Sequence, residues 1–276
     1  MRKIIFICSL EHSGSTILNL FLGQHSKIIP IGEVSNSSAK LKKFDKHKRI
    51  CACGKCLDDC EYWGKVIRKN EQNPPTSAEM EYEHLLNVFS EIYDDSMIIC
   101  DESKQIASLA HLKARADVQL KVIYLIKDIR SYLTSQSYKS QKKLGRKLSF
   151  SAHLNAAQSW YNSNKKILRF LDEQKLSYIQ LGYEEFCLYP DETTRLVFDF
   201  LNLEPPVNTA MLEKENCHIA FGNRMRRNPV KSARLYYDNR WFRNTTSHIV
   251  YAAMPWVKRL NEAVTYSNDF EKMWKS

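Results

Sequence analysis

A glycine-containing loop rich in hydroxyl groups lies near the start of the chain. Ser13, Gly14, Ser15 and Thr16 follow an apolar run, Lys3–Ser9, and precede apolar residues at helical spacing. A loop that leads from a buried strand into a helix presents backbone N–H groups to an anion, and the helix adds about half a positive charge. The glycine permits close approach, and the hydroxyls can donate to phosphate or sulfate oxygens. The pattern predicts an anion-binding loop, although an ordinary capped helix start has the same composition.

A second cation stands where another apolar run ends. Lys127 directly follows Gln119–Ile126, and Ser135 lies eight residues later, two turns into an expected helix. A lysine and a hydroxyl placed in this way can converge on one phosphate. The alternative is a solvated lysine and a serine on the helix surface.

A carboxylate is a candidate general base, and a lysine is a candidate for stabilising negative charge. Glu33 follows the first expected helix, so the chain can return there towards the anion loop. Lys104 closes the segment Asp101-Glu102-Ser103-Lys104, which follows the expected strand Ser96–Cys100 and should open at the same carboxyl edge of the sheet. A surface carboxylate and a salt-bridged loop lysine are the alternatives.

Basic residues also cluster late in the chain. They follow Gly222 and Asn223 and comprise Arg224, Arg226, Arg227, Lys231 and Arg234. Such a cluster is either an anion clamp or a solvated basic face. Another basic stretch, Lys139–Lys147, has no apolar period, and we expect an exposed loop there.

Four of the eight cysteines lie within ten residues: Cys51, Cys53, Cys56 and Cys60. Their density suits a tetrahedral zinc site, although the C-x-C spacing is less typical than paired C-x-x-C knuckles. Structural zinc, a loop disulfide and plain thiol packing are all open from the sequence.

Strands alternate with helices along the chain. The expected strands are Lys3–Ser9, Ser96–Cys100, Gln119–Ile126 and Leu176–Leu181, and the expected helices are Ala78–Tyr93, Ile129–Lys139, Ser151–Glu173 and Asp191–Leu201. This order predicts an α/β fold with a mostly parallel sheet flanked by helices. No linker or repeat divides the chain, so we predict one domain over residues 1–276.

Taken together, these motifs resemble the sulfotransferase family, whose fold is similar to that of P-loop nucleotide-binding proteins. Residues 12–16, His-Ser-Gly-Ser-Thr, resemble the family's 5′-phosphosulfate loop, with His12 where Lys or Arg is usual. Lys127 and Ser135 resemble its 3′-phosphate signature, with Lys in place of Arg. Residues 183–186, Tyr-Glu-Glu-Phe, and the C-x-C-G…C-x-x-W pattern that ends at Trp63 also resemble family segments.

The resemblance implies a donor and a set of roles. The donor would be 3′-phosphoadenosine 5′-phosphosulfate (PAPS), bound by residues 12–16, Lys127 and Ser135. Gly222, Asn223 and Arg226 resemble a G-N-x-x-R segment that closes over the nucleotide. Glu33 matches a catalytic base, Lys104 matches a lysine that stabilises the sulfuryl group, and His12 would assist at the donor. No catalytic metal is implied.

The composition limits the partners but does not identify the acceptor. There are 41 Lys and Arg against 31 Asp and Glu, a formal charge of +10, which favours anionic ligands. The first apolar run is short for a signal peptide, and no run is long enough to cross a bilayer, so we expect a cytoplasmic protein. The resemblance leaves the acceptor unidentified among carbohydrates, lipids and small molecules, and the basic stretch Lys139–Lys147 would attract an acidic one. The sequence does not determine the oligomeric state.

Two other function classes compete with this interpretation. A kinase on a similar fold should have a G-x-x-x-x-G-K-[ST] loop, which is absent. A basic nucleic-acid-binding protein with a zinc knuckle should carry aromatic residues interleaved with the basic ones, and none lie near the cysteines in that pattern.

Overall fold

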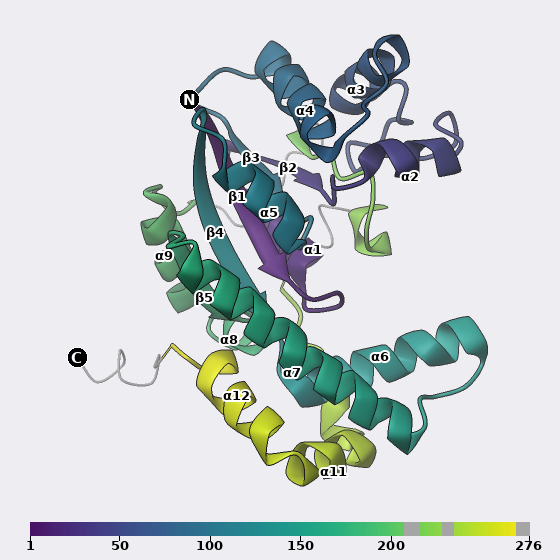
Figure 1. Ribbon diagram of the computed structural model, residues 1–276, viewed down its shortest axis with the longest axis vertical. Coiled ribbons are helices and arrows are strands. Elements are labelled where there is room, and N and C mark those ends of the chain that lie inside the picture. The colour runs from purple at the N-terminus through teal and green to yellow at the C-terminus, as the bar shows by residue number, and fades with distance from the viewer. Residues whose placement is uncertain (207–215, 228–234, 269–276) are drawn as a thin grey trace. The chain divides into compact units, whose positions relative to one another are not determined.

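The computed structural model describes residues 1–206, 216–227 and 235–268. The chain forms two compact units, each built from segments far apart in the sequence (Figure 1). Unit 1 comprises Met1–Cys8, Ser15–Val122 and Pro205–Arg234, and unit 2 comprises Ser9–Gly14, Ile123–Glu204 and Leu235–Ser276. The single domain predicted over residues 1–276 stays a prediction.

Five parallel strands form the sheet, in the order β2-β3-β1-β4-β5. They are β1 (Arg2–Ser9), β2 (Ile28–Gly32), β3 (Ile98–Asp101), β4 (Val118–Ile126) and β5 (Tyr178–Gly182). In unit 1, β1 pairs with β3 from Lys3 opposite Ile98 to Phe6 opposite Asp101. The strands are rich in buried apolar residues, as a parallel sheet covered by helices requires. The α/β prediction is confirmed.

The described helices of unit 1 are α1 (Ser15–Leu22), α2 (Ser37–Lys43), α3 (Glu61–Gln72), α4 (Ala78–Ile92), α5 (Ile106–Lys113) and the 3-10 turn η2 (Arg224–Arg227). Two of them, α3 and α4, begin at a side-chain cap. The Cys60 thiol accepts from the backbone of Trp63 at the start of α3, and the Ser77 hydroxyl caps α4. All eight residues of α1 are buried, so this helix belongs to the core.

Unit 2 holds the longest helix of the described residues. Its helices are α6 (Ile129–Leu144), α7 (Phe150–Glu173), α8 (Tyr183–Leu188), α9 (Pro190–Leu201), η3 (Arg240–Arg243), α11 (Thr245–Ala253) and α12 (Pro255–Thr265). The 24-residue α7 packs against the end of β4, where Trp160 donates to the Lys127 carbonyl at 3.2 Å. This contact fixes the backbone at a predicted anion site.

The expected strands are present with small shifts at their ends, but β2 has no counterpart in the sequence-based prediction. Pro30 and Gly32 interrupt its short apolar run. Proline is tolerated because β2 lies at the edge of the sheet, where a missing N–H costs no internal pairing.

The prediction of a loop at Lys139–Lys147 is wrong for residues 139–144, which are helical. Helix α6 continues to Leu144, because Gln, Lys and Leu are good helix formers even without an apolar stripe. Gly145, with φ 73°, then ends the helix in the left-handed conformation. The basic residues of the stretch are exposed, as expected.

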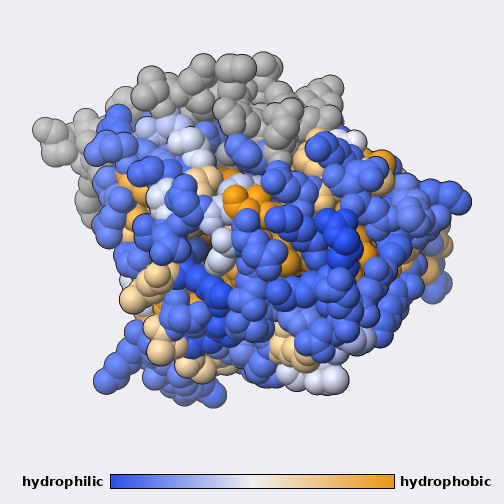
Figure 2. All heavy atoms as spheres, turned by 90° about the horizontal axis from the view of Figure 1, so that it is seen from above, coloured by the Kyte–Doolittle hydropathy of each residue, from blue (hydrophilic) through white to orange (hydrophobic). Residues whose placement is uncertain are grey.

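One face of the molecule is largely hydrophilic, with apolar side chains visible only in small patches (Figure 2). Among the described residues, each helix is too short or too polar to span a bilayer.

Candidate functional site

The predicted anion loop joins β1 to α1. His12 and Gly14 both have positive φ, 66° and 96°, and the Ser13 N–H donates to the Leu10 carbonyl at 3.3 Å. Ser13 and Ser15 are buried, whereas His12 is exposed. The strand, tight loop and helix therefore stand as the sequence predicts.

Gly14 is required by its surroundings as well as by its conformation. A Cβ atom at this position would lie 2.5 Å from Cδ2 of Tyr183, within unit 2. The same tyrosine ring supports Lys127, whose Nζ lies 4.2 Å from the ring centroid. Tyr183 thus connects the loop glycine with the cation of the second predicted site, a role that the sequence did not reveal.

Lys127 is a buried cation with a hydroxyl beside it. Its side chain is almost fully enclosed, and its Nζ donates to the Ser135 hydroxyl at 3.4 Å. Burial lowers the pKa of Lys127, while the nearby carboxylates of Glu184 and Asp238 act in the opposite direction. The structure brings together the two residues that the eight-residue spacing predicted.

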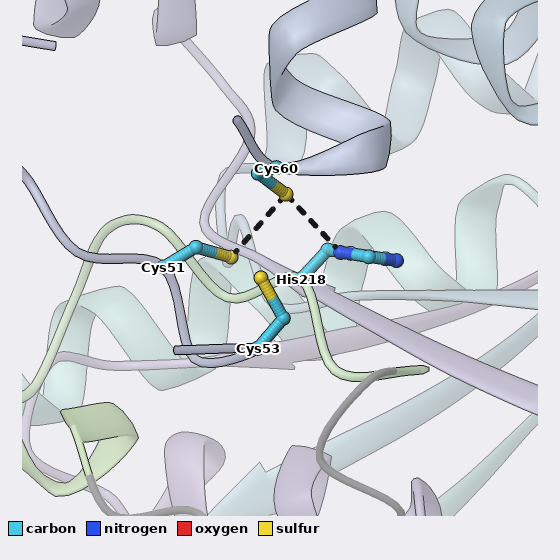
Figure 3. Close-up of side chains that lie close together, drawn as sticks. All are labelled: Cys51, Cys53, Cys60 and His218. Carbon is cyan, nitrogen blue, oxygen red and sulfur yellow. Dashed lines mark hydrogen bonds between the residues drawn. The ribbon is translucent and has the colours of Figure 1, made fainter. Parts of the chain in front are cut away.

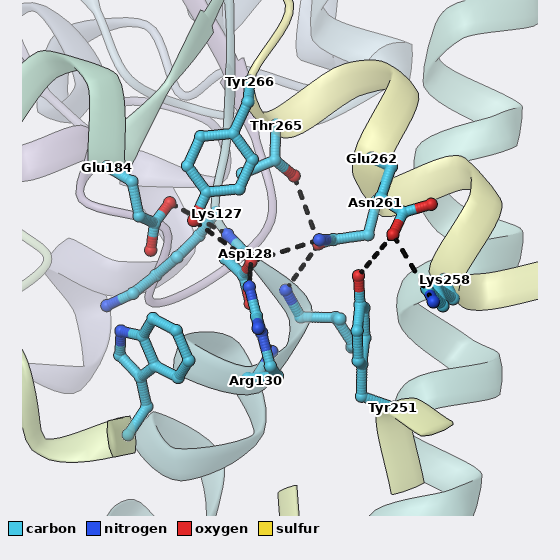
Figure 4. Close-up of polar contacts among 12 residues, drawn as sticks. Lys127, Asp128, Arg130, Glu184, Tyr251, Lys258, Asn261, Glu262, Thr265 and Tyr266 are labelled. Atoms are coloured by element: carbon cyan, nitrogen blue, oxygen red, sulfur yellow. Dashed lines mark hydrogen bonds and ion pairs between the residues drawn. The ribbon is translucent and has the colours of Figure 1, made fainter. Parts of the chain in front are cut away.

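A polar network holds the backbone at Lys127 (Figure 4). The Asp128 N–H donates to Glu184 at 3.0 Å. The buried Asp128 carboxylate accepts hydrogen bonds from three side chains, those of Arg130, Asn261 and Tyr266. Arg130 lies in the first turn of α6, whereas Asn261 and Tyr266 lie in α12 and at its C-terminal end. The carboxylate therefore links the start of α6 to α12.

Glu33 and Lys104 form an ion pair in unit 1. Glu33 directly follows β2, and Lys104 follows β3 in a left-handed conformation with φ 68°. The Lys104 ammonium contacts Glu33 Oε1, and Lys40 Nζ lies 3.9 Å from Glu33 Oε2. The predicted base and the predicted sulfuryl-stabilising lysine are therefore neighbours.

Glu102 is a buried carboxyl group that the sequence suggested only as a salt-bridge partner for Lys104. Its Oε1 accepts from the Thr16 hydroxyl at 3.2 Å, and its Oε2 has no hydrogen-bond partner among the described residues. Burial raises the pKa of Glu102 to about 7, with Lys104 opposing and Glu33 reinforcing the shift. This carboxyl group changes charge near neutral pH, directly beside the start of α1.

The segment at Gly222 passes close to both glutamates. A Cβ at Gly222, where φ is 97°, would lie 3.3 Å from Glu102 Oε1 and 3.4 Å from Glu33 Oε1. Asn223 accepts the Met225 N–H at 3.0 Å and so shapes the following turn. The glycine lets this backbone approach the carboxylates.

Arg226 is buried, and only part of its guanidinium group forms a hydrogen bond with the described residues. It donates to the Ile50 carbonyl at 2.6 Å, while its Nε has no hydrogen-bond partner among the described residues. Burial, with Arg49 nearby, lowers the pKa of Arg226 to about 10. Arg226 fastens its segment to residue 50, and its predicted nucleotide contact stays a prediction. Lys231 and Arg234 lie outside the described residues, as does the side chain of Arg224.

The cysteine cluster includes a histidine in place of one expected cysteine. Ligand atoms of Cys51, Cys53, Cys60 and His218 all lie within 4.8 Å of one another (Figure 3). Cys56 is not part of this group, and its thiol donates to Asp59 at 2.8 Å. All eight cysteines of the chain are free thiols.

Comparison with known proteins identifies the family. A model described as "Sulfotransferase family" matches residues 5–206, well over half of the chain. The chain belongs to the sulfotransferase family. Its match ends before Gly222, Asn223 and Arg226, so the roles of those three residues rest on the resemblance alone.

A solved structure shows the same fold as this sulfotransferase. The sulfotransferase domain from the Synechococcus PCC 7002 olefin synthase is similar over 96% of this chain and 95% of that chain, with a TM-score of 0.60 and 18% identity. A comparison with curated proteins found no match.

Proposed function

We propose that this sulfotransferase moves a sulfuryl group from PAPS to a hydroxyl or amine of an acceptor. The observation that carries the proposal is Tyr183, which packs against both the glycine of the anion loop and Lys127. A donor with anionic groups at its 3′ and 5′ positions needs two anion-binding sites, and the anion loop and Lys127 would supply them.

The donor's 3′-phosphate would be bound by Lys127 and Ser135, and its 5′-phosphosulfate by Ser13, Ser15, Thr16 and the loop N–H groups. His12 would add charge when protonated. A phosphate of up to −2 charge makes charge-assisted hydrogen bonds of about 1.5 to 3 kcal/mol each. Four such contacts suffice for micromolar affinity, about 8 kcal/mol, after ordering costs.

The transfer step uses the Glu33–Lys104 pair. The acceptor oxygen or nitrogen forms a bond to sulfur while the bond from sulfur to the bridging phosphate oxygen breaks. Glu33 takes the acceptor proton, and Lys104 stabilises the negative charge on the sulfuryl and bridging oxygens. The bound donor competes with Glu33 for Lys104, so donor binding frees the Glu33 carboxylate to act as a base. The products are 3′-phosphoadenosine 5′-phosphate (PAP) and a sulfated acceptor.

The acceptor belongs to one of three classes: a carbohydrate, a lipid or a small molecule. The exposed lysines at the end of α6 favour an acidic acceptor by attraction. A kinase activity is disfavoured, because residues 12–16 contain no lysine for a transferring phosphate.

Turnover of PAPS tests the catalytic roles. PAP release is measured by chromatography with an oligosaccharide, a glycolipid and a phenol as acceptors, for wild type, Glu33→Gln and Lys104→Ala. We expect each substitution to lower the turnover by about 100-fold or more, while PAP affinity changes little for Glu33→Gln. Turnover by Glu33→Gln equal to that of wild type would contradict the role of Glu33 as the base.

A further inference from the structure

The cysteine cluster brings together three segments of unit 1. Cys51 and Cys53 lie in a tight turn closed by an antiparallel bridge between Ile50 and Cys56. Cys60 is the N-cap residue of α3, and His218 comes from the segment that leads to Gly222. In Figure 3 the three thiols and the imidazole lie close to one another around one small space.

The separations fit a tetrahedral metal site. Zinc–sulfur bonds of about 2.3 Å place the corners of a tetrahedron about 3.8 Å apart. Cys60 Sγ lies 3.7 Å from Cys51 Sγ and 3.3 Å from His218 Nδ1. A disulfide needs sulfur atoms about 2.05 Å apart, so the thiol pair is not bonded.

The His218 imidazole is also held at Nε2, the nitrogen that does not face Cys60. His218 Nε2 lies 2.7 Å from the Tyr93 hydroxyl, and the Tyr62 ring stacks on the imidazole at 5.7 Å between centroids. Trp63 holds the histidine backbone by donating to its carbonyl at 2.6 Å. Metal-binding histidines are typically fixed in this way, by a hydrogen bond at the nitrogen that does not face the metal.

We propose that Cys51, Cys53, Cys60 and His218 bind one structural zinc ion. Thiolates with an imidazole are a donor set that zinc prefers, and four protein ligands leave no open position for a substrate. Cys51, Cys60 and His218 are buried, so the ion would be enclosed by the protein.

The ion would fasten the segment that approaches the two glutamates. His218 lies four residues before Gly222, and the Ala52 N–H donates to the Ile219 carbonyl at 3.1 Å. Arg226 makes a second attachment to Ile50 on the other side of Gly222. The backbone near Glu33 and Glu102 is therefore anchored to the cysteine turn on both sides. The zinc site itself does not depend on the proposed donor or acceptor.

Metal content and cobalt substitution test the site. The full chain is purified under reducing conditions and its zinc content measured by mass spectrometry; the metal-free protein is then titrated with Co²⁺. We expect about one zinc per chain, and visible absorption of tetrahedral cobalt with a thiolate charge-transfer band in the near ultraviolet.

Variants identify the ligands. Cys53→Ser should weaken zinc binding at least tenfold, and Tyr93→Phe by about 10- to 100-fold. Cys56→Ser is the matched control and should keep one zinc. His218→Cys should keep the metal with a stronger charge-transfer band, so the proposal stays testable if Cys53→Ser does not fold.

Two results would overturn the proposal. One is a folded wild-type protein that takes up neither zinc nor cobalt at equimolar concentration. The other is loss of metal from Cys56→Ser equal to the loss from Cys53→Ser. Since PAP binding is measured separately, failure of the zinc site is distinguishable from failure of the proposed function.

Discussion

Glu102 combines complete burial with a place beside the predicted anion loop. Its pKa of about 7 means that the folded protein holds a proton there at pH values where an exposed glutamate is ionised. A protonated Glu102 removes a negative charge from the neighbourhood of Thr16. Donor binding should therefore favour the protonated form.

The free energy of unfolding should change with pH because Glu102 has different pKa values in the folded and unfolded states. In the unfolded chain the pKa of Glu102 is that of an ordinary glutamate, 4.5, and in the folded protein burial raises this pKa to about 7. The contribution of the Glu102 carboxyl group to the free energy of unfolding is therefore complete below pH 4.5. It is lost as pH rises to 7, because only the unfolded state releases the proton in that range. In Glu102→Gln this loss, at most about 3 kcal/mol, should be absent.

Urea unfolding at pH 5 and pH 8 measures the effect. Glu91→Gln, at an exposed position in α4, is the control and should keep the wild-type pH dependence. If Glu102→Gln also kept it, the raised pKa would be wrong.

At the scale of elements, the connection between β1 and α1 depends on one glycine. Gly14 has a conformation that other residues rarely adopt, and Tyr183 occupies the space that a side chain would need. The loop shape and the position of Tyr183 are consequently linked.

Gly14→Ala should distort the loop. We expect a loss of about 1 to 3 kcal/mol in the free energy of unfolding and PAP affinity at least tenfold weaker. Gly145→Ala is the matched control: its φ is 73°, but nothing lies within 4 Å of the added Cβ. It should lose stability while keeping PAP affinity. Folded Gly14→Ala with wild-type affinity would exclude the loop as a donor site.

Local patterns in the sequence predicted some elements and not others. The strand–loop–helix at residues 13–16 and the pairing of Lys127 with Ser135 follow from spacing within one connection. Strand β2 was missed because Pro30 and Gly32 hide its apolar pattern, and the end of α6 because helix propensity outweighed the missing stripe. Such elements depend on their neighbours in the sheet or on small propensity differences.

Over the whole molecule, the residues that sequence patterns missed are those brought in from a distance. His218 is 158 residues from Cys60, and no spacing rule joins them. Glu102 stands out only because of its burial, which depends on the packing of unit 1. Tyr183 lies in a segment that resembles the family, but its contacts with Gly14 and Lys127 appear only in the folded chain.

The family match places the chain in the sulfotransferase family, and the identity of the donor is the central claim of the proposed function. Its most direct test is calorimetric titration of the full chain with PAP, with ATP as the competing nucleotide. The comparison includes Ser15→Ala, Lys127→Ala and, as a charge-matched control, Lys143→Ala at the exposed end of α6.

We predict micromolar affinity of the wild type for PAP, weaker binding of ATP, and a loss of about 10- to 100-fold for Lys127→Ala. Ser15→Ala should also weaken binding, and Lys143→Ala should change it little. A folded wild type that does not bind PAP, or equal losses for Lys127→Ala and Lys143→Ala, would contradict the account.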